Sequence, residues 1–257
     1  TDFDADVWYK TLSKALYMET LIERHGAIMD EYDPDKKVGM IVDEWGTWYT
    51  CEPGTNPGFL YQQNTMRDAI VAALSLNIFN KHSDRIAMAN IAQVVNVLQA
   101  MLLTEGSKIL KTPTYDVFRM YVPHQGAELV ESHTDETTCV ESGRTVKGPA
   151  VHYNDITIPA LSESVSVTEQ NGQKLLTITL VNTSLCDTLS VQLELPMQYS
   201  FAGEASIAML DGEVHAYNTF EDPDHVRAYE TEEEWSGNIQ TLTLPVNSVC
   251  RVNCYVC

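Results

Sequence analysis

The hydrophobic pattern of the chain changes near residue 122, and this change limits the possible fold more than any other feature. Before it, apolar residues recur at helical spacing between short runs that are apolar throughout. After it, apolar and polar residues alternate in short runs separated by turn residues. The first pattern indicates α/β units and the second an antiparallel β-sandwich. We therefore predict two domains, residues 1–122 and residues 123–257.

In the first part, the spacing of apolar residues predicts helices over residues 3–25 and 68–80. The apolar runs MIVDEW and RIAMANIAQVV predict buried strands, and the segment VNVLQAMLL at the end of the second run predicts a further helix. The order helix, strand, helix, strand, helix is typical of α/β proteins with parallel strands.

In the second part, the pair Asn171-Gly172 between two alternating runs predicts a β-hairpin, because both residues readily adopt the positive φ of a tight hairpin turn. The runs LSVQLELP, EASIAML and TLTLPVNSVCRVNCYV continue the strand pattern. We interpret the acidic run YETEEEW as a solvated loop.

The 257-residue chain has 16 basic and 36 acidic residues, for a formal net charge of −20. Such a surface repels phosphate backbones, so we expect no nucleic-acid partner. No apolar run reaches the roughly eighteen residues of a membrane span, and the first residues lack the basic start and apolar core of a signal peptide. We expect a cytoplasmic protein without a membrane partner.

Six cysteines are too few in a chain of this length to indicate a disulfide scaffold. Three lie in the C-terminal run CRVNCYVC, where strand alternation places Cys250 and Cys254 on one face and Cys257 on the other. No histidine lies nearby to complete a metal site, so we expect buried free thiols there. Nothing in the sequence calls for a metal or an organic cofactor.

The strand predicted at MIVDEW ends on two carboxylates, Asp43 and Glu44, and Trp45 and Trp48 follow closely. In α/β barrels, residues at the carboxyl ends of strands carry the chemistry, although a structural carboxylate paired inside the fold is the alternative for Glu44. Flat aromatic faces beside a carboxylate are a common way to hold a sugar ring. For Trp45, core packing is the favoured interpretation.

Longer motifs add a family resemblance. The segments DEWGTWY, GFLYQQNTMRDAIVAALSLNIFNKHSDRIAMANIAQVVNVLQAMLLTEG and TPTYDVFRMYVPHQGA cover most of residues 3–126, and AYNTFEDPDHV follows in the second part. They resemble the C-terminal half of α-L-arabinofuranosidases of glycoside hydrolase family 51. The resemblance implies the C-terminal portion of a catalytic (β/α)8 TIM barrel followed by an antiparallel β-sandwich of jelly-roll type. It also implies a retaining hydrolase that removes terminal non-reducing α-L-arabinofuranosyl residues from arabinan, arabinoxylan and their oligosaccharides.

The resemblance also implies site residues. Glu44 matches the family's catalytic nucleophile, Gln93 matches a glutamine that hydrogen-bonds the sugar, and Trp48 matches an aromatic residue that lines the site. A retaining glycosidase uses two carboxyl groups about 5–5.5 Å apart, one ionised for attack and one protonated to assist the leaving group. Glu44 suits the ionised role.

Three polar residues near these positions have structural interpretations. His82 and Asp84, in KHSDR, are expected to fix the turn before the next strand, and Asn96 is expected to be structural.

One part of the family pattern is missing. The family places its acid/base glutamate in an Asn-Glu motif on the fourth barrel strand, and no such motif occurs in this chain, which matches only the last two strands. We therefore expect a fragment that lacks activity by itself and has the N-terminal half of the same enzyme as its partner. Because family members often form hexamers, a homo-oligomer is a further hypothesis.

Two other hypotheses stay open. One is a non-catalytic carbohydrate-binding or assembly module in which the sandwich does the binding, although its aromatic residues are scattered along the sequence. The other is a related hydrolase for a different glycan, since a fold does not determine a substrate. Calorimetric binding of arabinan to the isolated chain separates the binding module from the enzyme.

Overall fold

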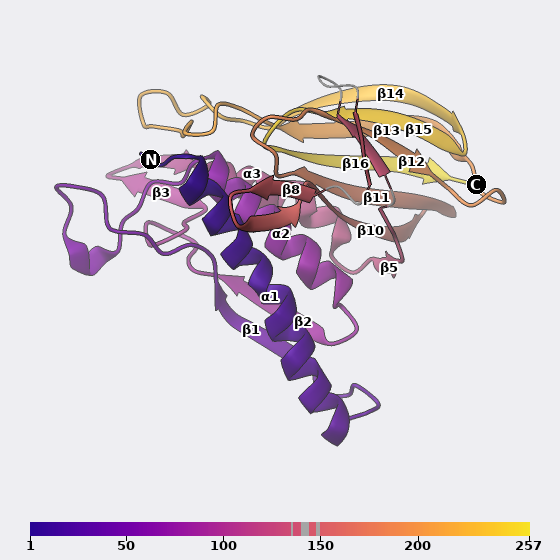
Figure 1. The fold of residues 1–257 in the computed structure, drawn as a ribbon, viewed down its shortest axis with the longest axis horizontal. Helices are drawn as coiled ribbons and strands as arrows, with labels where there is room; N and C mark the ends of the chain where they lie inside the picture. The colour runs from indigo at the N-terminus through magenta and orange to yellow at the C-terminus, as the bar shows by residue number, and fades with distance from the viewer. Residues whose placement is uncertain (135, 140–143, 148–149) are drawn as a thin grey trace. The chain divides into compact units, whose positions relative to one another are not determined.

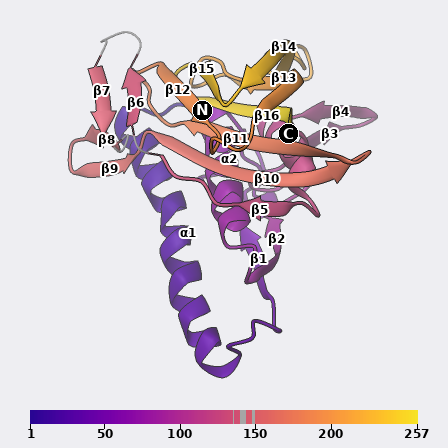
Figure 2. The same cartoon turned by 90° about the vertical axis from the view of Figure 1, so that its right-hand side faces the viewer.

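The computed structural model describes residues 1–134, 136–139, 144–147 and 150–257. The chain forms two compact units, Thr1–Phe118 with Glu213–Val226, and Arg119–Gly212 with Arg227–Cys257. Figures 1 and 2 label the elements of both units. The packing of Glu213–Val226 with the first unit is a feature that the alternating pattern did not indicate, and the domain boundary after residue 122 stays a prediction.

The first unit contains three helices, two pairs of strands and a short 3-10 helix within the described residues. Its elements are α1 (Ala5–Tyr32), β1 (Met40–Trp45), η1 (Pro57–Phe59), α2 (Met66–Lys81), β2 (Ile86–Ile91), β3 (Leu102–Glu105), β4 (Lys108–Lys111) and α3 (Pro113–Tyr121), the last of which continues into the second unit.

Helix α1 confirms the helix predicted from residue 3 and extends beyond residue 25. It begins where the Asp4 carboxylate accepts a 2.9 Å hydrogen bond from the amide of Val7, an N-cap that satisfies one free donor of the first turn. It ends at Tyr32, with Asp33 as its C-cap, because Pro34 cannot continue the helical hydrogen bonds. Trp8 and Leu12 are fully buried on its inner face.

Helix α2 confirms the prediction for residues 68–80 and is the central helix of the first unit. Thr65 and Asp68 form a reciprocal capping box that fixes its start. Nearly every residue up to Phe79 is buried, which explains why the sequence is apolar around most of the helix. It packs against α1.

Strands β1 and β2 confirm the two predicted parallel strands, but their predicted burial is wrong for this chain, because Trp45 is the one buried residue in them. Met40 pairs with Ile86 at one end and Trp45 with Ile91 at the other, so both strands run in the same direction. They lie side by side in both views (Figures 1 and 2). In the described part of the chain this sheet has two strands and no closed barrel, so the (β/α)8 barrel stays a prediction.

The helix predicted for VNVLQAMLL is wrong. After β2 the chain runs through an irregular loop, in which Asn96 and Leu98 have positive φ values of 60° and 53°, and then enters the antiparallel β3–β4 hairpin. The Asn96 side chain accepts a 2.7 Å hydrogen bond from the amide of Thr104 and donates one to its hydroxyl. These tertiary contacts override the helical spacing of the apolar residues.

In the described residues, the second unit contains a six-stranded and a four-stranded sheet, both antiparallel. The first has the order β14-β13-β16-β11-β10-β5 and the second β15-β12-β6-β7. Their bounds are β5 (Glu128–Val130), β6 (Glu136–Cys139), β7 (Arg144–Lys147), β10 (Leu161–Gln170), β11 (Gln173–Asn182), β12 (Leu189–Glu194), β13 (Phe201–Leu210), β14 (Tyr229–Gly237), β15 (Ile239–Leu244) and β16 (Ser248–Val256). A separate hairpin pairs β8 (Ala150–Tyr153) with β9 (Ile156–Pro159), and η2 (Val122–His124) precedes β5.

One hydrophobic core joins the two sheets, which is the arrangement of a β-sandwich. Leu189 and Leu244 from the smaller sheet belong to the same buried cluster as Phe201 and Ile178 from the larger one. The predicted antiparallel sandwich is therefore supported, whereas its jelly-roll type stays a prediction.

Local predictions for the sandwich have mixed outcomes. The hairpin at Asn171-Gly172 is confirmed, with φ values of 53° and 77° between the paired strands β10 and β11. Cys250 and Cys254 are buried and unpaired while Cys257 is exposed, as alternation predicted. The solvated loop predicted at YETEEEW is wrong, because this run forms β14 by pairing with β13, although its glutamates remain exposed.

Candidate active site

Glu44 and Gln93 lie at the carboxyl ends of neighbouring parallel strands. Trp45 pairs with Ile91, and the amide of Ala92 donates a 2.8 Å hydrogen bond to the carbonyl of Trp45. Glu44 comes directly before Trp45, and Gln93 comes directly after Ala92. The two predicted site residues therefore belong to the same edge of the β1–β2 sheet, where α/β enzymes carry their reactive groups.

The end of β1 contains an irregularity at its two carboxylates. Val42 pairs with Ala89 and Trp45 with Ile91, so two residues of β1 lie opposite one residue of β2. A bulge of this kind changes the direction of side chains and is frequent beside active sites. Asp43 and Glu44 are both exposed.

The two tryptophans after Glu44 have different environments. Trp45 is 5% exposed and packs edge-on against Phe79 and parallel to Phe118, with ring centroids 5.3 and 6.0 Å away, so its predicted core role is confirmed. Trp48 is 70% exposed. An exposed tryptophan four residues after a strand-end carboxylate offers a flat apolar face at the position where the sequence predicted one.

A buried hydrogen-bond network holds the loop that carries Trp48. The Gln62 amide nitrogen donates to the carbonyl and hydroxyl of Thr47, at 3.2 and 3.0 Å, and its oxygen accepts from the amide of Tyr49 at 2.8 Å. The Thr47 hydroxyl donates to Asp68 at 2.7 Å, and the Thr47 amide donates to Gln99 at 2.9 Å. The backbone on both sides of Trp48 is therefore tied to the buried interior.

Charged and aromatic groups are packed below this loop. The Arg67 guanidinium lies 3.9 Å from the ring centroid of Phe3 and 4.1 Å from that of Tyr49. Burial raises the pKa of the fully buried Asp68, which Arg67 and three hydrogen bonds oppose. Burial and the neighbouring Asp68 also raise the pKa of Tyr49. These groups stabilise the loop from within and are not exposed at the strand ends.

Sequence patterns alone do not point to the network residues Thr47, Gln62 and Gln99. The sequence shows only that these uncharged polar residues lie beside segments that are otherwise apolar. Such residues form hydrogen bonds in turns and loops generally, so the pattern does not show which loops they connect.

The residues predicted to be structural make structural contacts. His82 ends α2 and contacts Glu19 of α1, and Asp84 pairs with Lys36. Asn96 holds the turn into β3 through Thr104. These contacts bear out their interpretation as turn and loop residues.

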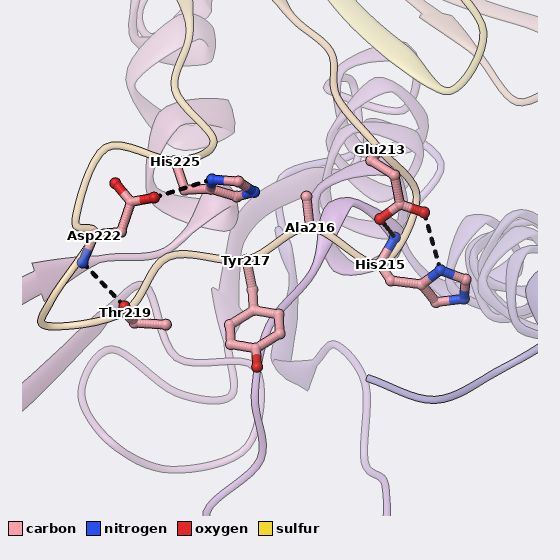
Figure 3. A pocket seen from close by; sticks show the side chains of 7 residues that line it. All are labelled: Glu213, His215, Ala216, Tyr217, Thr219, Asp222 and His225. Atoms are coloured by element: carbon pink, nitrogen blue, oxygen red, sulfur yellow. Dashed lines mark hydrogen bonds and ion pairs between the residues drawn. The ribbon is translucent and has the colours of Figure 1, made fainter.

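A separate hollow of about 350 Å³ is lined by the segment between β13 and β14. Its lining residues, drawn in Figure 3, are Glu213, His215, Ala216, Tyr217, Thr219, Asp222 and His225. Its two carboxylates already have partners, since Glu213 contacts His215 at 3.0 Å and Asp222 contacts His225 at 3.1 Å.

His215 also connects this segment to the start of the chain. Its Nε2 donates a 2.7 Å hydrogen bond to the carbonyl of Phe3, and this bond together with Glu213 raises the pKa of His215. The hollow is therefore lined by paired side chains that hold the segment in place. Among the residues that the structure describes, no group of three or more His, Cys, Asp and Glu side chains is placed to hold a metal ion.

Comparison with known proteins identifies the family. The family described as "Alpha-L-arabinofuranosidase C-terminal domain" matches residues 43–248, which include Glu44, Gln93 and most of the sandwich. The chain belongs to this family. The resemblance to the C-terminal half of family 51 arabinofuranosidases is thereby confirmed.

Individual arabinofuranosidases agree with this assignment. An intracellular exo-α-L-arabinofuranosidase of Bacteroides ovatus is 38% identical over 257 aligned residues, covering 97% of this chain and 46% of that protein. The family 51 arabinofuranosidase structure from Xanthomonas axonopodis pv. citri has a TM-score of 0.84 and 39% identity, covering 99% of this chain and 48% of that one. The arabinose complex of the Thermotoga maritima enzyme shares the fold, with a TM-score of 0.75, 23% identity and coverage of 98% and 51%.

The chain therefore spans about half the length of the arabinofuranosidases that it matches. Its relatives are glycosidases, which makes this an arabinofuranosidase-related chain. None of the helices in the described ranges is long and apolar enough to cross a membrane.

Proposed function

We propose that this chain provides the nucleophile-bearing part of a retaining α-L-arabinofuranosidase. The observation that carries the proposal is the position of Glu44 and Gln93 at the carboxyl ends of two paired parallel strands. The names of the relatives give the substrate class, α-L-arabinofuranosyl groups, and the B. ovatus enzyme is named as an exo-acting one. Both support the removal of terminal arabinofuranosyl residues from arabinose-containing polysaccharides and oligosaccharides as the proposed activity.

In the proposed reaction, the carboxylate of Glu44 attacks the anomeric carbon and forms a glycosyl ester, while a protonated carboxylic acid donates to the leaving oxygen. Water then breaks the ester, and the second carboxyl group acts as base. Gln93 binds a sugar hydroxyl through its amide, which has both a donor and an acceptor. Trp48 contacts the apolar face of the substrate.

We place the acid/base on a second part of the enzyme. Two observations support this. The relatives are about twice as long as this chain. In addition, Ile41 and Met88 on the β1–β2 sheet are 53% and 52% exposed, which is unusual for apolar residues in the middle of parallel strands. Further strands of a (β/α)8 barrel, supplied by the N-terminal half, would cover this face.

Location and assembly belong to the same proposal. The B. ovatus relative is named intracellular, which supports a cytoplasmic enzyme. From the family resemblance we also propose that the sandwich after residue 122 is of jelly-roll type and that the enzyme forms a homo-oligomer. In the described part of the sandwich, the exposed aromatics Tyr199 and Tyr229 come from different segments, which does not favour a carbohydrate-binding face.

The test uses the complete enzyme, with this chain and its N-terminal half present. Replacing Glu44 by alanine should lower kcat on a nitrophenyl arabinofuranoside by more than about 10⁴-fold, because the covalent step loses its nucleophile. Adding azide to this variant should restore turnover and yield an arabinofuranosyl azide, since azide takes the place of the missing carboxylate.

Asp43→Ala is the matched control, because Asp43 is the neighbouring exposed carboxylate of the same bulge. It should not respond to azide. Full activity of Glu44→Ala, or azide rescue at Asp43 in its place, would show that the nucleophile has been assigned wrongly.

A further inference from the structure

Gln99 is fully buried although it lies in an irregular loop, and its side-chain amide uses both ends. The oxygen accepts a 2.9 Å hydrogen bond from the amide of Thr47. The nitrogen donates to the carbonyl of Asp68 at 2.7 Å and to the hydroxyl of Thr114 at 3.2 Å. A buried amide with all these partners is rigid, and removing it leaves several buried polar groups unpaired.

Gln99 also contacts the backbone between Glu44 and Thr47. Gly46 has a φ of +127°, and a Cβ built on it would lie 3.1 Å from the Gln99 side-chain oxygen and 3.4 Å from its Cβ. The chain after Glu44 therefore lies directly against the Gln99 side chain, at a residue that only glycine suits.

The main chain of Gln99 is connected to the other strand end. Its amide donates a 3.1 Å hydrogen bond to the carbonyl of Ala92, the residue before Gln93. One residue thus contacts the loop after β1, the loop after β2, and the first turns of α2 and α3. The two loops carry Trp48 and Gln93, and the loop after β1 begins two residues after Glu44.

We infer that Gln99 is a positioning residue, which sets the relative placement of the Glu44–Trp48 segment and the Gln93 loop through its buried amide. The inference rests on the proposed function, because it assigns Gln99 a role in the same reaction. Gln99 touches no substrate in this account. Its effect reaches the sugar through Thr47 and Ala92.

The expected effect is large because nucleophilic attack depends on geometry. A displacement of about 1 Å of a reacting group can lower the rate about 10²-fold. Without the Gln99 amide, the Thr47 N–H has no buried acceptor and the loop must shift to find one. Binding of the substrate depends on several contacts and should change less than the chemical step does.

The test compares two buried amides in the complete enzyme. Gln99→Met keeps the side-chain length and removes its hydrogen bonds. Asn182→Leu does the same in the sandwich, where Asn182 is fully buried and its amide donates to the carbonyls of Asp187, Leu244 and Pro245. Both variants should lower Tm, so loss of stability alone predicts similar kinetics for both at a temperature where both are folded.

We expect Gln99→Met to lower kcat about 10- to 100-fold with a KM change of less than about threefold, whereas Asn182→Leu keeps both constants within twofold of wild type. Equal kinetics for the two variants would overturn the inference, and so would wild-type kcat in folded Gln99→Met.

A second pair of variants decides the matter if Gln99→Met does not fold. Thr114→Ser keeps the hydroxyl that accepts from Gln99, and Thr114→Val removes it at similar volume. The serine variant should keep wild-type kcat and the valine variant should lose several-fold. Equal kcat values for these two would contradict the inference. Failure of the proposed function has a different signature, which is full activity of Glu44→Ala.

Discussion

At the scale of single residues, the structure separates side chains that look alike in the sequence. Trp45 and Trp48 lie three positions apart, yet one is 5% and the other 70% exposed. Asp43, Glu44 and Asp68 are all acidic, but only Asp68 is buried, with a raised pKa. Residue type suggested candidates for the site, and only the structure shows which of them are exposed and which are buried.

The buried His124 should make the stability of the protein depend on pH. Its ring nitrogens form hydrogen bonds with the hydroxyls of Ser166 at 2.7 Å and Thr179 at 3.2 Å, and burial lowers its pKa to about 4 from an ordinary 6.5. The unfolded chain binds a proton at this residue below pH 6.5 and the folded chain only below about 4. Stability should therefore decrease as pH falls through that window and level off below it.

When the pH falls from 7 to 5, the titration of His124 should lower the free energy of unfolding by up to about 2 kcal/mol. Urea unfolding of the wild type and of His124→Gln at pH 7 and pH 5 measures this decrease, because glutamine keeps hydrogen-bonding groups and does not titrate. A wild-type pH slope equal to that of His124→Gln would contradict the burial of a neutral imidazole.

At the scale of secondary-structure elements, replacing glycine by alanine should have opposite effects on stability in the hairpin turn and in the long helix. Gly172 has a φ of +77° in the β10–β11 turn, so Gly172→Ala should destabilise the protein by about 1 kcal/mol. Gly26 lies inside α1 with no atom within 4 Å of a built Cβ, so Gly26→Ala should stabilise it by about 0.5–1 kcal/mol. Chemical denaturation measures both, and a shared sign would be inconsistent with these conformations.

Strand β14 carries its charges at the edge of the larger sheet. An unpaired strand edge can add a strand from another molecule, and natural proteins oppose this with charged residues. Replacing the exposed Glu232 and Glu234 by threonine should keep β14 paired with β13 and promote association, seen as increased light scattering at raised protein concentration. Unchanged scattering would show that these glutamates do not protect the edge.

Strongly periodic elements could be predicted from the sequence, and the loops between them could not. Helix α2, the strands β1 and β2 and the hairpin at Asn171-Gly172 follow from local patterns. The predicted helix at VNVLQAMLL failed because contacts far along the chain, such as those of Gln99 with Thr47 and Thr114, determine that backbone. The run YETEEEW failed because its strand exists only through pairing with β13.

At the scale of the whole molecule, the segment Glu213–Val226 connects two strands of the sandwich and yet packs with the first unit. Asn218 anchors it by donating to the carbonyl of Lys111 at 2.9 Å, and Phe220 packs against the cluster of Leu103 and Leu110. This part of the chain carries the AYNTFEDPDHV motif of the family resemblance. The motif thus has a structural role that local periodicity does not reveal.

The central claim is that Glu44 is the nucleophile of an arabinofuranosidase, and covalent trapping tests it most directly. A fluorinated arabinofuranoside with a good leaving group should react with the complete enzyme and accumulate as a glycosyl-enzyme ester. Fluorine slows both formation and hydrolysis of the ester, and the good leaving group compensates for this only in the formation step. Peptide mass spectrometry should then locate the added sugar on Glu44, in the peptide that contains MIVDEWGTWY. A label on any other side chain would contradict the account.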